Sequence, residues 1–248
     1  LFGIGMMYTV LSCRVIFSFT VINLSIFQKN LAISLLVQHM NSELGQYFTT
    51  DLQLQKVLVA FCKNAAHGKD RIKRPDPKRV ILEPSAGKGD VVAAMHTAFP
   101  HCVTHSVEID SSLPPAYMRK PDVWICADFL KTDLPRSSYR TIVGNPPYVR
   151  TKGKNLYLLF IEKCLSILSP GGEMVFVLPS DFFRLTSAGK ILEAMVAKGA
   201  FTDIYRPNND RLFKGATVDV MVIRYEKTKK LPQECRDYET GAILPYSL

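Results

Sequence analysis

Residues 79–90 read RVILEPSAGKGD, an apolar run followed by a turn of small residues and the start of a helical pattern. Short apolar runs bounded by turn residues predict buried strands. From here to residue 225 such runs alternate with helical stretches, a pattern typical of a doubly wound α/β fold. The expected strands span 79–83, 102–108, 123–126, 141–144, 173–178, 202–205 and 217–225, and the expected helices span 52–63, 91–98, 156–168 and 188–198. The sequence therefore predicts a mostly parallel, seven-stranded, Rossmann-like sheet.

Composition supports a globular body with an apolar head. The chain has 248 residues, 47% of them hydrophobic, with a formal net charge of +9, which excludes general disorder. Residues 1–40 contain only two charged residues, Arg14 and Lys29, so the remainder holds 29 basic and 22 acidic residues, a net of +7. Residues 63–79 read as a linker with seven of these basic residues. A basic excess favours a polyanionic partner without identifying one.

The head, residues 1–39, allows two interpretations. The segment from Met6 to Phe27 approaches the about 20 apolar residues of a membrane span, but Arg14 interrupts it. Met40 is followed at once by polar sequence, so our hypothesis is that the natural start is Met40 and the head is an upstream extension. The alternative is a membrane-anchoring helix. We expect one domain over residues 40–228 and a tail over 229–248.

Six cysteines are scattered along the chain without a CxxC pair or zinc-like spacing. Isolated thiols in a chain of this length indicate reduced, mostly buried cysteines in an intracellular protein. We therefore predict no metal site.

Acidic residues end three successive predicted strands. Glu83 lies in a turn that lacks the phosphate-loop pattern, and its carboxylate favours a cationic or amine-bearing ligand over a pyrophosphate. Glu108, about twenty positions beyond the glycine turn, can accept both hydroxyls of a ribose. Asp128 can accept from an adenine amino group, and Phe129 can cover the ring. Each acid alone is more often a helix cap or a solvated loop end, but together they favour an adenosine site without a phosphate anchor, and hence S-adenosylmethionine over NAD or ATP.

The stretch 141–148, TIVGNPPY, predicts the chemistry. Its prolines, Pro146 and Pro147, fix the backbone and remove two N–H donors, which leaves carbonyl acceptors. The side-chain oxygen of Asn145 and the carbonyl of Pro146 can each accept one hydrogen of an amino group. Those bonds pull the nitrogen toward sp³ geometry and aim its lone pair at an electrophilic methyl group, while Tyr148 can stack on the attached ring. The alternative is a proline turn that merely ends a strand.

The ordered set of motifs resembles the gamma-class adenine-N6 DNA methyltransferases, in which the cofactor motifs precede the catalytic motif. The resemblance covers roughly residues 44–227 and implies the sheet of an S-adenosylmethionine-dependent methyltransferase, with residues 40–228 as the catalytic domain. The matching segments are QYFT at 46–49, EPSAGKGD at 83–90, VEID at 107–110, ADFL at 127–130, NPPY at 145–148, the helix and strand over 156–183, and RLFKGATV at 211–218.

The resemblance implies a role for each site residue. Thr49 is expected to meet the methionine end of the cofactor, and Phe213 to stack on an extruded base opposite Tyr148. The implied catalytic residues are Asn145, Pro146, Pro147 and Tyr148. The implied cofactor-binding residues are Thr49, Glu83, Ser85, Ala86, Gly87, Gly89, Glu108, Ile109, Asp128, Phe129 and Asn145.

The expected activity is methyl transfer from S-adenosylmethionine to N6 of an adenine flipped out of double-stranded DNA, in a restriction-modification setting. Arg150, Lys152 and Lys154 follow the catalytic motif and are expected to contact DNA phosphates. The family carries a target-recognition domain after the last strand, and residues 229–248 read as the start of a truncated one. A separate specificity subunit or a paired restriction endonuclease is the expected partner, at a nucleoid-associated, cytoplasmic location and without membrane attachment.

Two alternatives remain open. The NPPY motif also resembles that of protein-glutamine N5 and some RNA methyltransferases, because a planar amide or another exocyclic amine fits the same acceptors. The QYFT motif and Phe213 favour DNA adenine over these. The other alternative is a non-catalytic remnant that binds cofactor or DNA.

Overall fold

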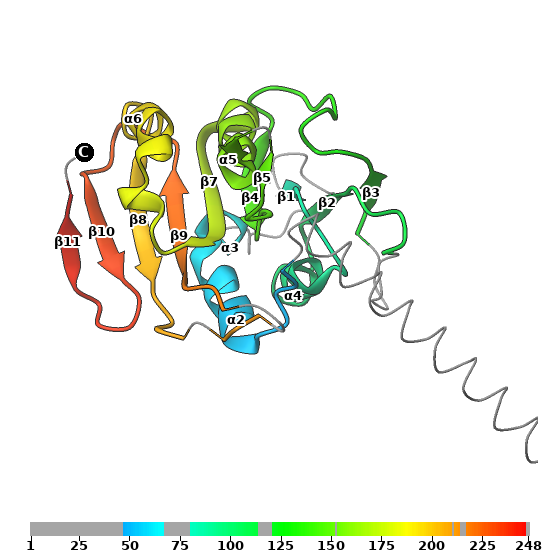
Figure 1. Cartoon of the computed structure of the whole chain (residues 1–248), viewed down its shortest axis with the longest axis horizontal. Helices are drawn as coiled ribbons and strands as arrows, with labels where there is room; N and C mark the ends of the chain where they lie inside the picture. The colour runs from blue at the N-terminus through cyan, green and yellow to red at the C-terminus, as the bar shows by residue number, and fades with distance from the viewer. Residues whose placement is uncertain are drawn as a thin grey trace, which may run out of the picture. The chain divides into compact units, whose positions relative to one another are not determined.

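The computed structural model describes residues 47–66, 80–113, 121–151, 153–209, 211–213 and 217–246. Within them, a nine-stranded sheet in the order β11-β10-β8-β9-β7-β4-β1-β2-β3 carries helices on both faces (Figure 1). Its strands are β1 (Val80–Glu83), β2 (Val103–Glu108), β3 (Val123–Cys126), β4 (Tyr139–Gly144), β7 (Leu168–Pro179), β8 (Ala200–Tyr205), β9 (Val220–Glu226), β10 (Glu234–Asp237) and β11 (Ile243–Pro245). The helices are α2 (Leu52–Phe61), α3 (Lys63–Ala66), α4 (Asp90–Ala98), α5 (Leu156–Ile167) and α6 (Gly189–Val196), with two 3-10 turns at Phe182–Arg184 and Thr186–Ala188.

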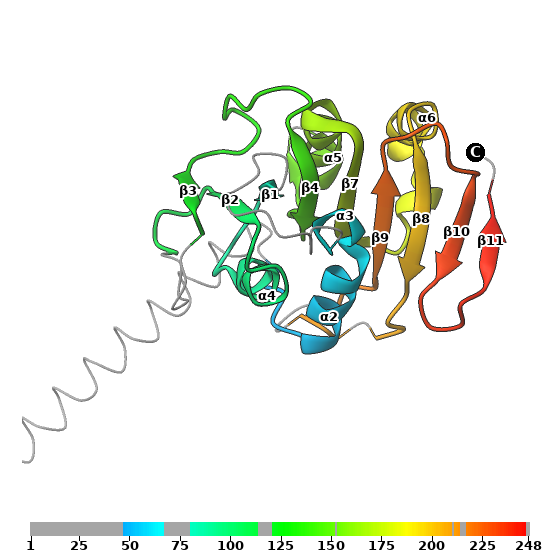
Figure 2. The same ribbon diagram turned by 180° about the vertical axis from the view of Figure 1, so that it is seen from behind.

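The strand directions confirm a doubly wound, mostly parallel sheet. Strands β3, β2, β1, β4 and β7 run parallel to one another, whereas β9 runs antiparallel to both β7 and β8. The expected number of seven strands was wrong, because β10 and β11 extend the edge beside β8 (Figure 2). β10 reads Glu-Cys-Arg-Asp, and β11 has only three residues, Ile-Leu-Pro, so neither gives an apolar run long enough to predict a strand.

The core follows from alternation along the central strands, because successive side chains of a strand point to opposite faces. In β7, Met174 and Phe176 belong to the cluster under α5 and α6, whereas Val175 and Val177 belong to the cluster under α2 and α4. Figures 1 and 2 show these helices on opposite sides of the sheet. Both faces are therefore covered, and the ends of the strands are left to form the site.

The predicted linker and the apolar head lie largely outside the described residues. The expected linker over 63–79 was wrong at its start, because Lys63–Ala66 form α3, and residues 67–79 lie outside the described residues. The head and the hypothesis about Met40 also lie outside them. In the part of the chain that the structure describes, no helix is both long and apolar enough to span a membrane.

Candidate active site

The loops that follow β1 and β4 meet the segment before α2 at the carboxyl edge of the sheet. They border a solvent-open cleft of about 250 Å³. Its lining residues are Tyr47, Phe48, Thr49, Glu83, Ser85, Ala86, Gly87, Asp90, Val91 and Asn145. Six predicted site residues are therefore brought together here, from segments almost one hundred positions apart.

The segment from Tyr47 to Asp51 is fixed on both sides. The side-chain amide of Asn145 donates to the Tyr47 carbonyl at 2.9 Å, and Gln55 donates to the Thr49 carbonyl at 2.7 Å. Asp51 caps α2 by accepting from the Leu54 N–H at 2.8 Å. These bonds place the buried Thr49 hydroxyl within 3.3 Å of the Asn145 amide nitrogen.

The turn after β1 needs its glycines. Gly87 has a φ of +53° and Gly89 a φ of +88°, in the left-handed region that L side chains rarely adopt. A Cβ at Gly87 would also lie 3.0 Å from the Phe48 ring. Gly89 opens α4 without a side-chain cap. Backbone therefore lines this side of the cleft, as the small-residue turn predicts.

Glu83 is a buried carboxyl with an unused acceptor. It is 2% exposed, and among the described residues its Oε2 atom has no hydrogen-bond partner. Burial raises the pKa of Glu83 well above its ordinary 4.5, and the nearby Glu108 adds to the rise. A Cβ at Gly144 would lie 2.2 Å from Glu83 Oε1, so only glycine at the end of β4 leaves room for this carboxyl. Sequence reasoning missed Gly144, although its position directly before Asn145 was a usable signal.

Glu108 joins two loops at the end of β2. One carboxylate oxygen accepts from the Gly87 N–H at 2.6 Å and the other from the Asp110 N–H at 2.9 Å. Burial raises its pKa above 4.5. Glu108 is not among the residues that line the cleft, while Ile109, the next residue, is 52% exposed.

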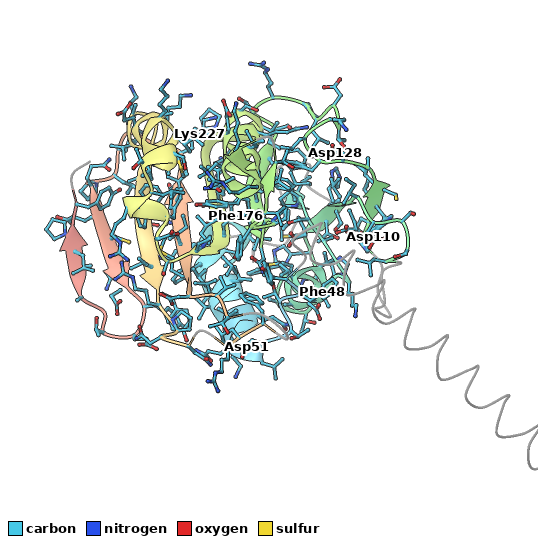
Figure 3. All side chains as sticks on the ribbon, in the orientation of Figure 1. Phe48, Asp51, Asp110, Asp128, Phe176 and Lys227 are labelled. Atoms are coloured by element: carbon cyan, nitrogen blue, oxygen red, sulfur yellow. The ribbon has the colours of Figure 1, made fainter. Side chains whose placement is uncertain are left out.

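Asp128 and Phe129 also lie away from the cleft. Asp128 accepts from the Leu130 N–H at 3.0 Å and pairs with Lys131 at 3.0 Å, so its side chain closes its own loop. Phe129 is buried against Phe160, with ring centroids 4.9 Å apart. Figure 3 shows Asp110 and Asp128 toward the β3 edge of the sheet and Phe48 beside α4. Their adenine-binding roles stay predictions.

The orientation of Asn145 follows from its partners. Because the Tyr47 carbonyl can only accept, the amide nitrogen of Asn145 must face it, and Oδ1 is left as an acceptor. Here Oδ1 accepts from the Tyr148 hydroxyl, which also reaches the Val177 carbonyl at 3.0 Å. Burial raises the pKa of Tyr148 well above 10.0, so this hydroxyl remains a donor. Pro146, next in the chain, is buried and Pro147 is partly buried.

Three aromatic rings lie beside Asn145. The Tyr47 ring is 5.3 Å from the Tyr148 ring and 5.5 Å from the Phe213 ring, measured between centroids. The two predicted stacking residues therefore share one neighbour, Tyr47, which sequence reasoning missed. Tyr47 reaches these rings because the segment before α2 packs against the loop that contains Asn145.

The basic residues after the catalytic motif lie on a small hairpin of β5 (Arg150–Thr151) and β6 (Lys154–Asn155). Arg150 and Lys154 are exposed, and Lys152 lies outside the described residues. Lys63, from the other basic stretch, instead pairs with Asp203 at 2.7 Å.

Comparisons with known proteins agree with this geometry. Residues 119–213, which include the NPPY motif and Phe213, match the model of the Eco57I restriction-modification methylase family. Over these residues the chain matches a restriction-modification methylase domain. It is 27% identical to the type II methyltransferase M.HincII of Haemophilus influenzae over 210 residues, which cover 76% of this chain and 38% of that protein. It is 30% identical to the type II methyltransferase M.TthHB8I of Thermus thermophilus over 205 residues, covering 67% of this chain and 45% of that protein.

Solved structures place the methylase domain in a known fold. The methyltransferase subunit of a type I restriction-modification system from Streptococcus thermophilus superposes with a TM-score of 0.60 at 15% identity, over 84% of this chain and 53% of that one. The predicted methyltransferase-type, Rossmann-like fold is thereby confirmed. The chain spans less than half the length of M.HincII and of M.TthHB8I.

Proposed function

We propose that the methylase domain transfers a methyl group from S-adenosylmethionine to N6 of an adenine in double-stranded DNA. The observation that carries this proposal is the orientation of Asn145. Its amide nitrogen is tied to the Tyr47 carbonyl, so its oxygen is left to accept a hydrogen from an amino group beside the cleft.

The residues of the cleft fit S-adenosylmethionine. The cofactor supplies a sulfonium whose methyl group is electrophilic. The unpartnered Glu83 oxygen offers an acceptor to its cationic or amino groups, and the backbone around Gly87 allows close approach. A carboxyl at this position disfavours a pyrophosphate. Thr49 would hold the methionine end, next to Asn145, while Ser85, Ala86 and Gly89 shape the turn.

Glu108 and Asp128 would bind the adenosine part of the cofactor. Each Glu108 oxygen uses one lone pair on a backbone N–H, which leaves acceptor capacity for the two ribose hydroxyls. The exposed side chain of Ile109 would lie against the adenine, whose amino group would donate to Asp128. Phe129, packed in the core, would support this loop.

The target amine would be held by two acceptors. Asn145 Oδ1 and the Pro146 carbonyl would each take one hydrogen, which leaves the nitrogen lone pair free to attack the methyl group. In the structure the Tyr148 hydroxyl donates to Asn145 Oδ1. When an amine takes this acceptor, the hydroxyl would donate to the Val177 carbonyl instead. Tyr148 and Phe213 would stack on the two faces of the base, and Pro147 would hold the loop rigid. Orientation and fixed dipoles then supply the rate enhancement.

A restriction-modification DNA methyltransferase is supported by the family match and by the relatives, which are type II methyltransferases. The choice of adenine rests on the QYFT and NPPY motifs and on Phe213. Arg150, Lys152 and Lys154 would contact phosphates beside the pocket. As in the type I relative, which is one subunit of a larger system, a specificity subunit or a nuclease would complete the assembly.

The test is methyl transfer from labelled S-adenosylmethionine to unmethylated duplex DNA, to RNA and to a protein extract. We expect label in DNA, released as N6-methyladenine after hydrolysis. Label only in RNA or only in protein would identify the amino-methyltransferase alternatives. No label in any substrate, with S-adenosylmethionine still bound, would identify a non-catalytic remnant.

A further inference from the structure

The ring of Tyr47 contacts both of the rings that the proposed function assigns to stacking on the target base. Its centroid is 5.3 Å from that of Tyr148 and 5.5 Å from that of Phe213, with interplanar angles of 30° and 49°. Both separations fall in the range of direct aromatic contacts, about 4.5–7 Å. Tyr47 therefore packs against both rings that are proposed to hold the target base.

The backbone of Tyr47 is fixed, but its side chain is not. The Tyr47 carbonyl accepts from Asn145 at 2.9 Å, and Thr49, two residues later, is held by Gln55. In contrast, none of the described residues hydrogen-bonds to the Tyr47 hydroxyl, and the residue is only partly buried. Rotation about the side-chain bonds would remove the ring from between its neighbours without disturbing the bond to Asn145.

We propose that Tyr47 is a placeholder for the target base. Its ring fills the space between Tyr148 and Phe213 when no DNA is bound, and an entering base displaces it. This inference rests on the proposed function, because it assigns Tyr148 and Phe213 to base stacking. Tyr47 is then a positioning residue that sets how readily a purine enters, while its backbone carbonyl keeps Asn145 oriented.

The test is binding of free deoxyadenosine, with the cofactor site saturated by S-adenosylhomocysteine so that only the base site is available. Wild type, Tyr47→Phe, Tyr47→Leu and Tyr47→Ala are compared by calorimetric titration. We expect Tyr47→Ala to bind deoxyadenosine at least about tenfold more tightly than wild type, which is about 1.4 kcal/mol. Tyr47→Phe should match wild type, because the ring and not the hydroxyl fills the site, and Tyr47→Leu should lie between them.

A matched control is Tyr238→Ala, since Tyr238 lies on the loop after β10 and packs on Phe61 and Tyr205 instead. It should leave deoxyadenosine binding unchanged. The placeholder role is overturned if Tyr47→Ala binds deoxyadenosine no more tightly than wild type while its melting temperature and affinity for S-adenosylhomocysteine are retained. If Tyr47→Ala does not fold, Tyr47→Leu decides in the same way.

A parallel assay separates this inference from the proposed function. Wild-type methyl transfer to plasmid DNA tests the function alone. Transfer without any gain in deoxyadenosine binding by the variants would reject only the placeholder. A gain in binding without wild-type transfer would support the displaceable ring and reject the proposed activity.

Discussion

Two buried glutamates of the sheet, Glu173 on β7 and Glu83 at the end of β1, differ in their hydrogen-bond partners. Glu173, on β7 beside Thr141 of β4, accepts from Arg224 at 2.9 Å, from the Thr141 hydroxyl at 3.0 Å and from the Asn64 N–H at 2.8 Å. At the carboxyl end of β1, Glu83 is as deeply buried, yet one of its oxygens has no partner among the described residues. Both carboxyls have their pKa raised by burial, but only Glu173 has a cation that opposes the rise.

This difference separates a structural site from a binding site. A buried charge stabilises a fold only when hydrogen bonds and a counterion offset its desolvation. Beside Glu173, Arg224 also contacts Glu226 at 2.9 Å and Thr202 at 2.7 Å. The hydrogen-bond network around Glu173 and Arg224 is therefore complete. Glu83 accepts from the Ser85 N–H at 3.4 Å through one oxygen, but its other oxygen has no partner among the described residues, as expected where a ligand supplies the missing partner.

The largest effect is expected from Asn145→Ala. Removing the amide acceptor should lower kcat by more than about 10³-fold, about 4 kcal/mol, because the amine loses the bond that orients it. The affinity for S-adenosylmethionine should fall much less than kcat, because Asn145 is one of ten residues that line the cleft. The control Asn64→Ala removes an amide at the opposite edge, where Asn64 donates to the Gly171 carbonyl at 2.9 Å. It should cost stability but not activity, and retained transfer by Asn145→Ala would refute the catalytic assignment.

The next effect concerns the complete network. Glu173→Leu should lower the free energy of unfolding by about 3 kcal/mol, because Arg224 is left buried without its main counterion. The double variant Glu173→Leu with Arg224→Leu should lose less than the single variant, because no charge is stranded. Urea unfolding measures both, and transfer per folded molecule should stay unchanged. A double variant as unstable as the sum of its parts would show that the pair is not coupled.

Glu83→Gln should act in the opposite direction on stability. Because the folded pKa of Glu83 lies above 4.5, the native state holds a proton that the unfolded chain has released. The stability contributed by the protonated carboxyl is present below about pH 4.5 and is lost as the pH rises through the raised pKa. Glu83→Gln should therefore raise the cofactor-free stability at pH 7 and flatten its decline with pH.

The same Glu83→Gln variant should bind S-adenosylmethionine about tenfold more weakly, as expected for one lost charge-assisted hydrogen bond of about 1.5 kcal/mol. Thermal denaturation between pH 4.5 and 8, with and without cofactor, measures both effects. A variant that is less stable than wild type at pH 7 would show that Glu83 is structural.

The sequence could predict elements with a local signal. Apolar runs between turn residues located the central strands to within a few residues, and the rule that parallel strands end at one edge brought Glu83 and Asn145 together correctly. Strands β10 and β11 were missed because β10, Glu-Cys-Arg-Asp, carries mostly charged residues and β11, Ile-Leu-Pro, has only three residues. Near the edge of a sheet, strands can be short and partly exposed, so they need little hydrophobic patterning.

Contacts between distant segments could not be predicted. Tyr47 meets Asn145 across 98 positions, and Arg224 meets Glu173 across 51. Arg224 lies in a mostly apolar strand, β9, where a charged residue first suggests a solvent-facing position. Only the structure shows that it is buried and paired with Glu173 and Glu226.

The smallest expected effect tests whether Asp128 binds a ligand, as proposed for Glu83, or is structural, as Glu173 is. Its side chain already accepts from Leu130 and pairs with the exposed Lys131, which favours a self-contained loop. If Asp128 also accepts from the adenine amino group, wild type should bind S-adenosylhomocysteine about fivefold more tightly than its inosine analogue, which lacks that group. Asp128→Ala should abolish this preference, while Lys131→Ala should keep it and change the stability by less than about 1 kcal/mol. Equal preference in wild type and Asp128→Ala would place Asp128 among the structural carboxylates.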